Sequence, residues 1–361
     1  MAGISCVDCV APALALMRRR LFEPFRFDYW SRLAVLGILA GELSSSGHYG
    51  RGRHGTHGIA PSFPHTNPQP NAHDIPDVIP HLNPHSNASA WIGQHWHILL
   101  GAIGAAIVVS LLFLYIGSVL RFVLYEAVLR DRAQIREGWV RWSDAGLEYF
   151  AFRLMVMVPY GFVAIYFVGV PLWRVFAAGG GGQELFATYV RLAGGVALVG
   201  FLGPIVGVVM VMTKDFVVPQ MMFEGISCAE GWRRLWHQVK AEPGSFAAYI
   251  LLKIVLVIPA YIMFAIALVI LAIPAALVIA TAVVVIKMTG LGHVAAFPAI
   301  IPAILLGVIA GVPGIIYVVG FVGAPISVFF PAYSIYYFAS RYRPLYDEVY
   351  GAPAGTQELP R

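Results

Sequence analysis

Charged residues are scarce in this chain of 361 residues. Asp, Glu, Lys and Arg make up 12% of it, about half of the roughly 25% that is usual in soluble domains, whereas 59% of the residues are hydrophobic. So few charges exclude a large soluble domain. A mean hydropathy of +0.74 instead predicts a protein that crosses a membrane several times.

Cysteine is nearly absent, and the sequences that mark common enzymes are missing. The Cys6-x-x-Cys9 pair has no second pair or nearby histidine to complete a zinc site, and Cys228 stands alone. The sequence contains no Walker loop, no His-Glu-x-x-His and no Gly-x-Ser-x-Gly. We therefore expect a protein that is not an enzyme, has no resident cofactor and binds no nucleic acid.

Long apolar runs are what the chain does have. Those long enough to cover a bilayer begin near Ile98, Phe150, Leu185, Phe246 and Pro313, and a shorter one begins near Leu33. They predict an all-α integral membrane protein of about six transmembrane helices. Residues 272–312 leave three alternatives open: a re-entrant hairpin, extensions of long kinked helices, or two further spans, which would give eight.

Lys and Arg are unevenly distributed between the predicted loops. Nineteen of them fall on one side of the spans and five on the other. Basic residues near span ends are retained on the cytoplasmic side of a membrane. The distribution therefore predicts a multi-pass membrane protein with both termini in the cytoplasm and the His-rich loop on the outside.

Five segments follow from the spans and the charges. They are a cytoplasmic amphipathic segment (1–30), a short first span (31–43), an external low-complexity loop rich in His, Pro and Asn (44–97), a helical membrane domain (98–340) with cytoplasmic loops at 121–150 and 214–245, and a cytoplasmic tail (341–361). The first segment is not predicted to be a signal peptide, because its charges follow its apolar stretch.

The two larger cytoplasmic loops resemble each other. One reads "FVLYEAVLRDRAQIREGWVRW" from Phe122, and the other "FVVPQMMFEGISCAEGWRRLW" from Phe216. Both begin Phe-Val and reach Glu-Gly-Trp-x-Arg after a nearly equal interval. The sequences "EPFRFDYW" and "EPGSFAAY", which lead into two of the spans, are also alike. We therefore expect pseudo-repeated helical hairpins.

Each of these loops predicts a short amphipathic helix in the membrane interface. Its two tryptophans are three or four residues apart and so share one helical face. Indole rings favour the headgroup level, and arginines bind lipid phosphates. The predicted lipid or partner contacts are Trp139, Arg141, Trp142, Trp232, Arg234 and Trp236. Anchoring alone is the simpler interpretation, and a docking platform for lipid or a partner is the functional one.

Ionisable residues are rare where the spans are expected. The second span, "ILLGAIGAAIVVSLLFLYIGSVL", has none, while Glu42, Arg191 and Lys253 lie near span ends. From such positions a side chain can snorkel to the interface. Coupled transporters need ionisable groups at membrane depth. The sequence therefore favours anchoring over proton-coupled transport.

The predicted external loop holds nine of the eleven histidines. It repeats the pattern His-x-Asn-Pro-x-x-Asn from His65 and from His81, which is typical of an unfolded spacer. Imidazole also binds zinc or nickel. The candidate ligands are His54, His57, His65, His81, His85, His95 and His97. Because a structural metal site needs a fold that closes around its ligands, a spacer is the simpler interpretation and weak metal binding is the alternative.

Several stretches together resemble a known family. They are "RRRLFEPFRFDYWSRLAVLG" at Arg18, "RFVLYEAVLRDRAQIREGWVRW" at Arg121, the loop at Phe216, "EPGSFAAYILLKIVL" at Glu242 and "ISVFFPAYSIYYFASRYRPLYDEV" at Ile326. The family comprises uncharacterised prokaryotic multi-pass membrane proteins similar to the membrane domain of some glycerophosphodiester phosphodiesterases. The resemblance implies six helices and a place in the prokaryotic inner membrane. Because the family has no established function, it implies no particular activity. The phosphodiesterase domain itself is absent here.

These features predict an accessory or scaffold component that engages membrane lipids, a partner protein or a second copy of itself. A transporter or channel for a small or lipidic solute is the alternative, and metal capture by the external loop is a third. An enclosed polar path through the helices would favour transport, whereas a bundle without a cavity would favour the scaffold.

Overall fold

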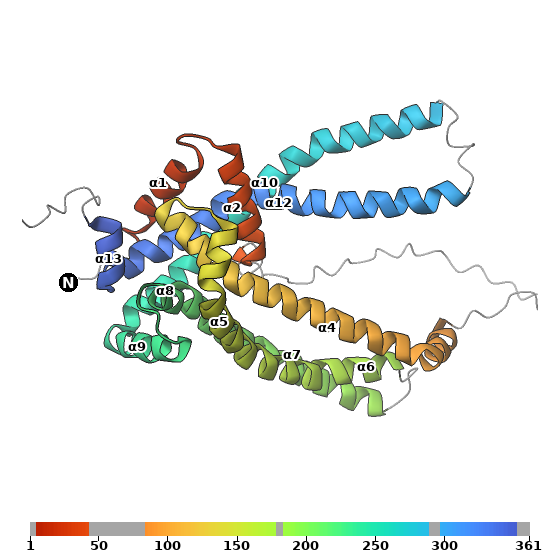
Figure 1. Cartoon of the computed structure of the whole chain (residues 1–361). Coiled ribbons are helices and arrows are strands. Elements are labelled where there is room, and N and C mark those ends of the chain that lie inside the picture. Colours follow the sequence, from red (N-terminus) through yellow and green to blue (C-terminus); the bar gives the residue numbers. More distant parts are fainter. Residues whose placement is uncertain (1–4, 43–83, 178–182, 289–296, 352–361) are drawn as a thin grey trace, which may run out of the picture.

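The computed structural model describes residues 5–42, 84–177, 183–288 and 297–351, and within these ranges the chain is all-helical, with no strand (Figure 1). The elements are α1 (Val10–Leu21), α2 (Phe27–Leu39), α4 (Pro84–Arg130), α5 (Ile135–Ala164), η1 (Ile165–Gly169), α6 (Val170–Ala177), α7 (Gln183–Met212), η2 (Thr213–Val217), α8 (Val218–Glu224), α9 (Cys228–Ala241), α10 (Pro243–Met288), α12 (Phe297–Ala339) and α13 (Arg343–Tyr350).

Five stretches of the described helices are long and apolar enough to cross a membrane. They are Gln94–Arg130, Ile135–Val175, Phe186–Glu224, Pro243–Ile273 and Pro313–Ala339. The sequence predicted six. The difference is the first predicted span, 31–43, because α2 in that region has only 13 residues, whereas a transmembrane helix needs about 20.

The ambiguous residues 272–312 belong to two long helices. α10 continues without a break to Met288, and α12 begins at Phe297. Figure 1 shows the two running side by side as one arm of the molecule. Within the described residues, the structure therefore corresponds to the helix extensions, one of the three alternatives that the sequence left open.

The long helices extend from one end of the molecule. Figure 1 shows α4, α5 and α7 as one arm and α10 with α12 as the other, while α1, α8, α9 and α13 gather where the arms meet. We call this end, together with α2 and the adjoining parts of the long helices, the hub. The largest buried side chains lie here, among them Phe216, Tyr249 and Tyr337. In three candidate spans none of the central apolar stretch is buried inside the protein, against 56% in Pro313–Ala339.

α2 is a short helix wedged between α4 and α12. The Trp30 indole donates to the Phe321 carbonyl oxygen at 2.8 Å, and the Tyr29 hydroxyl donates to the Ala127 carbonyl oxygen at 3.0 Å. Gly37 faces Ser327 so closely that a Cβ added to the glycine would lie 2.5 Å from the serine Cβ. Contacts near both ends of α2 therefore fix this helix inside the hub.

Candidate functional site

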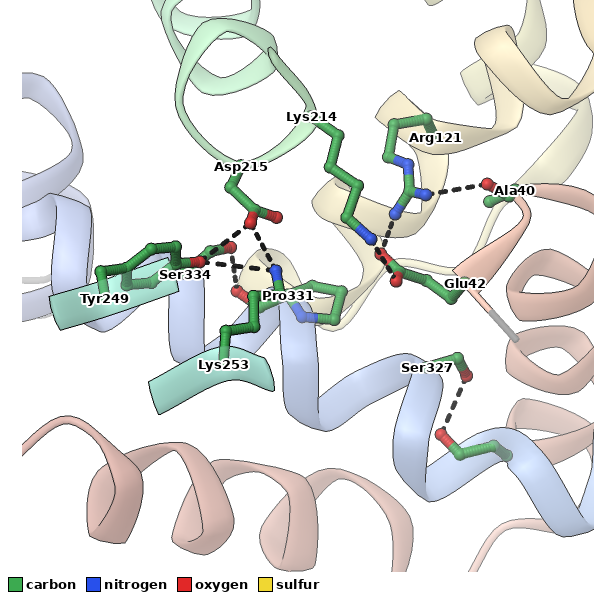
Figure 2. A network of polar contacts seen from close by, with 11 residues as sticks. Ala40, Glu42, Arg121, Lys214, Asp215, Tyr249, Lys253, Ser327, Pro331 and Ser334 are labelled. Atoms are coloured by element: carbon green, nitrogen blue, oxygen red, sulfur yellow. Dashed lines mark hydrogen bonds and ion pairs between the residues drawn. The ribbon is translucent and has the colours of Figure 1, made fainter. Parts of the chain in front are cut away.

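The centre of the hub is a π-helical turn, η2. It interrupts the helix between α7 and α8, and all five of its residues, Thr213–Val217, are buried. Such turns occur mostly as single insertions in α-helices, often at functional sites. Two adjacent residues of this turn are charged, Lys214 and Asp215, and their side chains point towards different partners (Figure 2).

Lys214 forms an ion pair with the carboxylate of Glu42, and an arginine pairs with the same carboxylate. The Lys214 Nζ atom lies 2.7 Å from Glu42 Oε2. Arg121 forms an ion pair with Glu42 Oε1, and its other terminal nitrogen donates to the Ala40 carbonyl oxygen at 2.8 Å. Gly41 has φ 74°, a left-handed conformation suited to glycine, and it turns the chain after α2 so that Glu42 stays inside.

Asp215 binds two side chains of α10. The Tyr249 hydroxyl donates to Asp215 Oδ2 at 2.9 Å, and the Lys253 ammonium forms an ion pair with the same oxygen. Tyr249 and Lys253 are four residues apart and therefore lie on one face of α10. The Tyr249 ring is stacked on Tyr333 of α12, with ring centroids 5.1 Å apart. The contacts of Asp215 with α10, together with the stacking of Tyr249 on Tyr333, thus link η2, α10 and α12.

These contacts form a network of five charged side chains, three cationic and two anionic. Each side chain is less than one-tenth exposed. The central pocket is lined by Glu42, Arg121, Leu124, Tyr125, Lys214, Asp215, Pro331 and Ser334, and the side chains leave no room for a water molecule in it. Burying a charge is costly unless it is paired. Here each carboxylate is paired with at least one cation, whereas the Arg121 Nε atom and the Tyr125 hydroxyl are buried without a hydrogen-bond partner among the described residues. We call these five residues, Glu42, Arg121, Lys214, Asp215 and Lys253, the charge network.

The two predicted tryptophans of the first loop face the protein, whereas the Arg141 side chain is 49% exposed. The Trp142 indole donates to Glu126 at 2.8 Å, and its ring is stacked on Phe122. Arg141 forms an ion pair with the same Glu126 carboxylate. Trp139 is partly buried and packs edge-on against Tyr115. The two tryptophans share a face, as the spacing predicts, but in the structure that face packs against the core.

The second loop supports η2 directly. The Trp232 indole donates to the Thr213 hydroxyl at 3.0 Å, and its ring is stacked on Phe152. Arg234 forms ion pairs with Glu224 and Glu230. Trp236, by contrast, is 53% exposed. Trp232 and Trp236 therefore do not share one environment, and of the four predicted tryptophans only Trp236 is exposed.

Corresponding glycines of the two loops make corresponding contacts. A Cβ added to Gly138 would lie 2.9 Å from the Val123 side chain, and one added to Gly231 would lie 2.7 Å from the Val217 side chain. Each pair joins the glycine of Glu-Gly-Trp to the valine of Phe-Val. Both loops therefore fold their helix back onto the preceding span at the same sequence positions.

The predicted metal ligands are mostly beyond what the structure describes. His54, His57, His65 and His81 lie outside the described residues, and His85 lies in α4 at a position whose side chain is not described. His95 stands at a kink in α4, and the neighbouring His97 is exposed. Among the described residues no group of three or more His, Cys, Asp or Glu side chains could hold a metal ion. Zinc or nickel binding by 44–97 stays a prediction.

The charge network is what the sequence prediction missed. Glu42 and Lys253 were expected to snorkel to the interface, which is wrong, because they are 1% and 7% exposed and paired inside the protein. The available signal was the adjacent Lys214 and Asp215 within a long apolar helix. Two opposite charges at that position indicate buried partners elsewhere in the chain.

Comparison with known proteins identifies a family whose function is unknown. A model of a family of unknown function matches residues 4–347, nearly the whole chain. Nothing in this match links the chain to the membrane domain of glycerophosphodiester phosphodiesterases. No curated protein and no solved structure matches the chain.

Proposed function

The chain belongs to the family of unknown function DUF7544, and we propose from its geometry that it is a non-enzymatic scaffold of the prokaryotic inner membrane that engages lipids or a partner protein. In this proposal the long helices cross the membrane, and the hub lies at its cytoplasmic side. The excess of Lys and Arg in the loops of that side supports this orientation.

One observation carries the proposal, namely that the charge network is closed. Its carboxylates each meet a cation, and its pocket has no room for a water molecule. A solute path requires polar groups that face an accessible cavity. A closed network that joins α2, α4, η2 and α10 is instead suited to hold the helices in one arrangement. That favours a scaffold over a carrier.

The two cytoplasmic loops support the same role. Their matching glycine–valine contacts are consistent with the internal repeat that the sequence predicts. Each loop uses a buried indole to fix its helix, through Glu126 in one case and Thr213 in the other. The hub is thus a rigid cytoplasmic platform, on which exposed groups such as Trp236 and Arg233 are available to lipids or to a partner.

The test is purification of the full chain in a mild detergent, followed by mass spectrometry of the lipids and proteins that remain bound. We expect a reproducible set that is enriched over a membrane protein of similar size carrying the same tag. An eluate with no lipid or protein enriched over that control would contradict the proposal.

A transporter is the second candidate, because ionisable residues are buried on a π-helical turn within a candidate span. Reconstituted vesicles containing a pH-sensitive dye separate the two functions. The scaffold predicts proton flux no faster than in protein-free vesicles. Flux that wild type supports and Asp215→Asn abolishes would favour transport.

A further inference from the structure

A second polar site lies at the outer surface of the hub. It is a cleft of about 470 Å³ between the start of α2 and the loop that joins α4 to α5. Its lining residues are Arg26, Phe27, Asp28, Tyr29, Arg32, Asp131, Arg132, Ala133 and Gln134. This cleft shares no residue with the charge network and none with α5 or α9.

The cleft carries more positive than negative charge. Asp131 is held by two arginines, with Arg26 at 3.0 Å and Arg20 at 3.3 Å, so its carboxylate is neutralised. Asp28 pairs with Arg32 at 2.8 Å on the surface of α2. Arg132 is exposed and has no carboxylate within ion-pair distance among the described residues. A guanidinium in this setting is suited to bind a phosphate with two parallel hydrogen bonds.

Two helices begin at the edge of the cleft, and neither start is capped by a side chain. Arg26 is the N-cap of α2 and Gln134 is the N-cap of α5, and neither side chain accepts a hydrogen bond from the first turn. The N-terminus of a helix favours negative charge. This adds to the attraction for an anion that the arginines provide.

The surroundings of the cleft favour a lipid over a soluble anion. The cleft lies between Arg130, where one candidate span ends, and Ile135, where the next begins. Phe27, which lines the cleft, is 60% exposed, and two further phenylalanines close to it in the sequence, Phe22 and Phe25, are 50% and 55% exposed. Exposed rings next to arginines are typical of a surface that sits in the headgroup region, with its rings in the acyl boundary.

We infer that this cleft binds the phosphate headgroup of an anionic phospholipid, with Arg132 and Arg32 as its principal contacts. The inference rests on the proposed membrane role and adds to it a ligand class and a site. In the bound state the phosphate occupies the cleft while the acyl chains lie along the exposed phenylalanine rings. Arg26 and Arg20 hold Asp131 away from the phosphate.

The test compares lipid binding by the full chain in nanodiscs. Phosphatidylglycerol is titrated against a phosphatidylcholine background, and bound lipid is counted by native mass spectrometry. The variant is Arg32→Gln/Arg132→Gln. We expect its affinity for phosphatidylglycerol to fall roughly 25-fold, because each arginine that hydrogen-bonds the phosphate directly contributes about a fivefold factor. Arg132→Gln alone, which breaks no ion pair, should lose about fivefold.

The matched control is Arg19→Gln/Arg343→Gln, which removes two exposed arginines that do not line the cleft. It should bind phosphatidylglycerol as wild type does. An equal loss in the control would overturn the inference in favour of bulk charge attraction. Protection from thermal unfolding by inorganic phosphate as strong as that by the lipid would overturn the lipid assignment. A wild-type chain that does not insert into nanodiscs would overturn the membrane role itself, whereas insertion with unchanged binding by the variants would overturn only the site.

Discussion

Glu42 and Lys214 are 172 positions apart in the sequence, yet their side chains form an ion pair of 2.7 Å in which the carboxylate is 1% exposed and the ammonium 7%. Arg121 binds the other oxygen of the same carboxylate. One carboxylate just after α2 therefore binds two cations that belong to two different long helices.

Replacing this carboxylate should destabilise the whole hub. Glu42→Gln keeps the size of the side chain but leaves Arg121 and Lys214 without their shared anion. Breaking a buried ion pair in this way costs about 3–5 kcal/mol. Unfolding followed in one detergent should show a loss of that order. Glu23→Gln, which removes an exposed partner of Arg18, is the control and should change little.

The packing of α2 against α12 gives a second prediction. Gly37→Ala would place a Cβ 2.5 Å from the Cβ of Ser327, so the helices must separate. Overpacking of this kind costs about 1–3 kcal/mol. Gly101→Ala is the matched control, because nothing lies within 4 Å of its added Cβ. Equal stabilities of the two variants would contradict close packing of α2.

The second Trp-containing loop, residues 214–245, should be tied to η2 by one hydrogen bond. Trp232→Phe keeps an aromatic ring but removes the donor to Thr213, and it should cost about 1 kcal/mol. Thr213→Val should lower the free energy of unfolding by a similar amount. The double variant should lose less than the sum of the two single losses, because both changes remove the same hydrogen bond. Trp236→Phe, at an exposed position, should be neutral. Additive losses at 213 and 232 would argue against the bond.

Cysteine reactivity tests the burial of the hub. Burial raises the pKa of the Cys9 thiol to about 11 and that of Cys228 to about 12. The thiolate is the reactive form, so at pH 8 both should resist N-ethylmaleimide in the folded protein, and both should react once it is unfolded. Cys6, which is only partly buried, should be labelled first. Peptide mass spectrometry measures the labelling of each cysteine. Rapid labelling of Cys228 at pH 8 would contradict the packing of α9.

The helices could be predicted from the sequence, whereas the site could not. Length and apolar composition locate the five long helices, because hydropathy averages over about 20 residues. The same averaging hides single charges such as Glu42, since a charged residue near a helix end gives the same signal whether it snorkels or pairs. Neither the π-helical turn at Thr213 nor the burial of α2 has a periodic signature, and both depend on partners far away in the chain.

The predicted amphipathic helices in the membrane interface show the same limit of sequence-based prediction. The spacing of Trp139 and Trp142 correctly implies a shared face, but spacing does not say whether that face meets lipid or protein. The deciding residues are Glu126 and Phe122, which lie in the preceding span and provide a hydrogen bond and a stacking surface. A tryptophan in the interface and one packed on a neighbouring helix have the same local sequence.

In our proposal the charge network locks the helices together, and the pair of Asp215 and Lys253 offers the sharpest test of that role. The measurement is the free energy of unfolding, in one detergent, of Asp215→Asn, Lys253→Met and the double variant. A lock predicts that each single variant loses about 3–5 kcal/mol, because each leaves a buried charge without its partner, and that the neutral double variant recovers most of this loss. Small, additive losses in the single variants would contradict it.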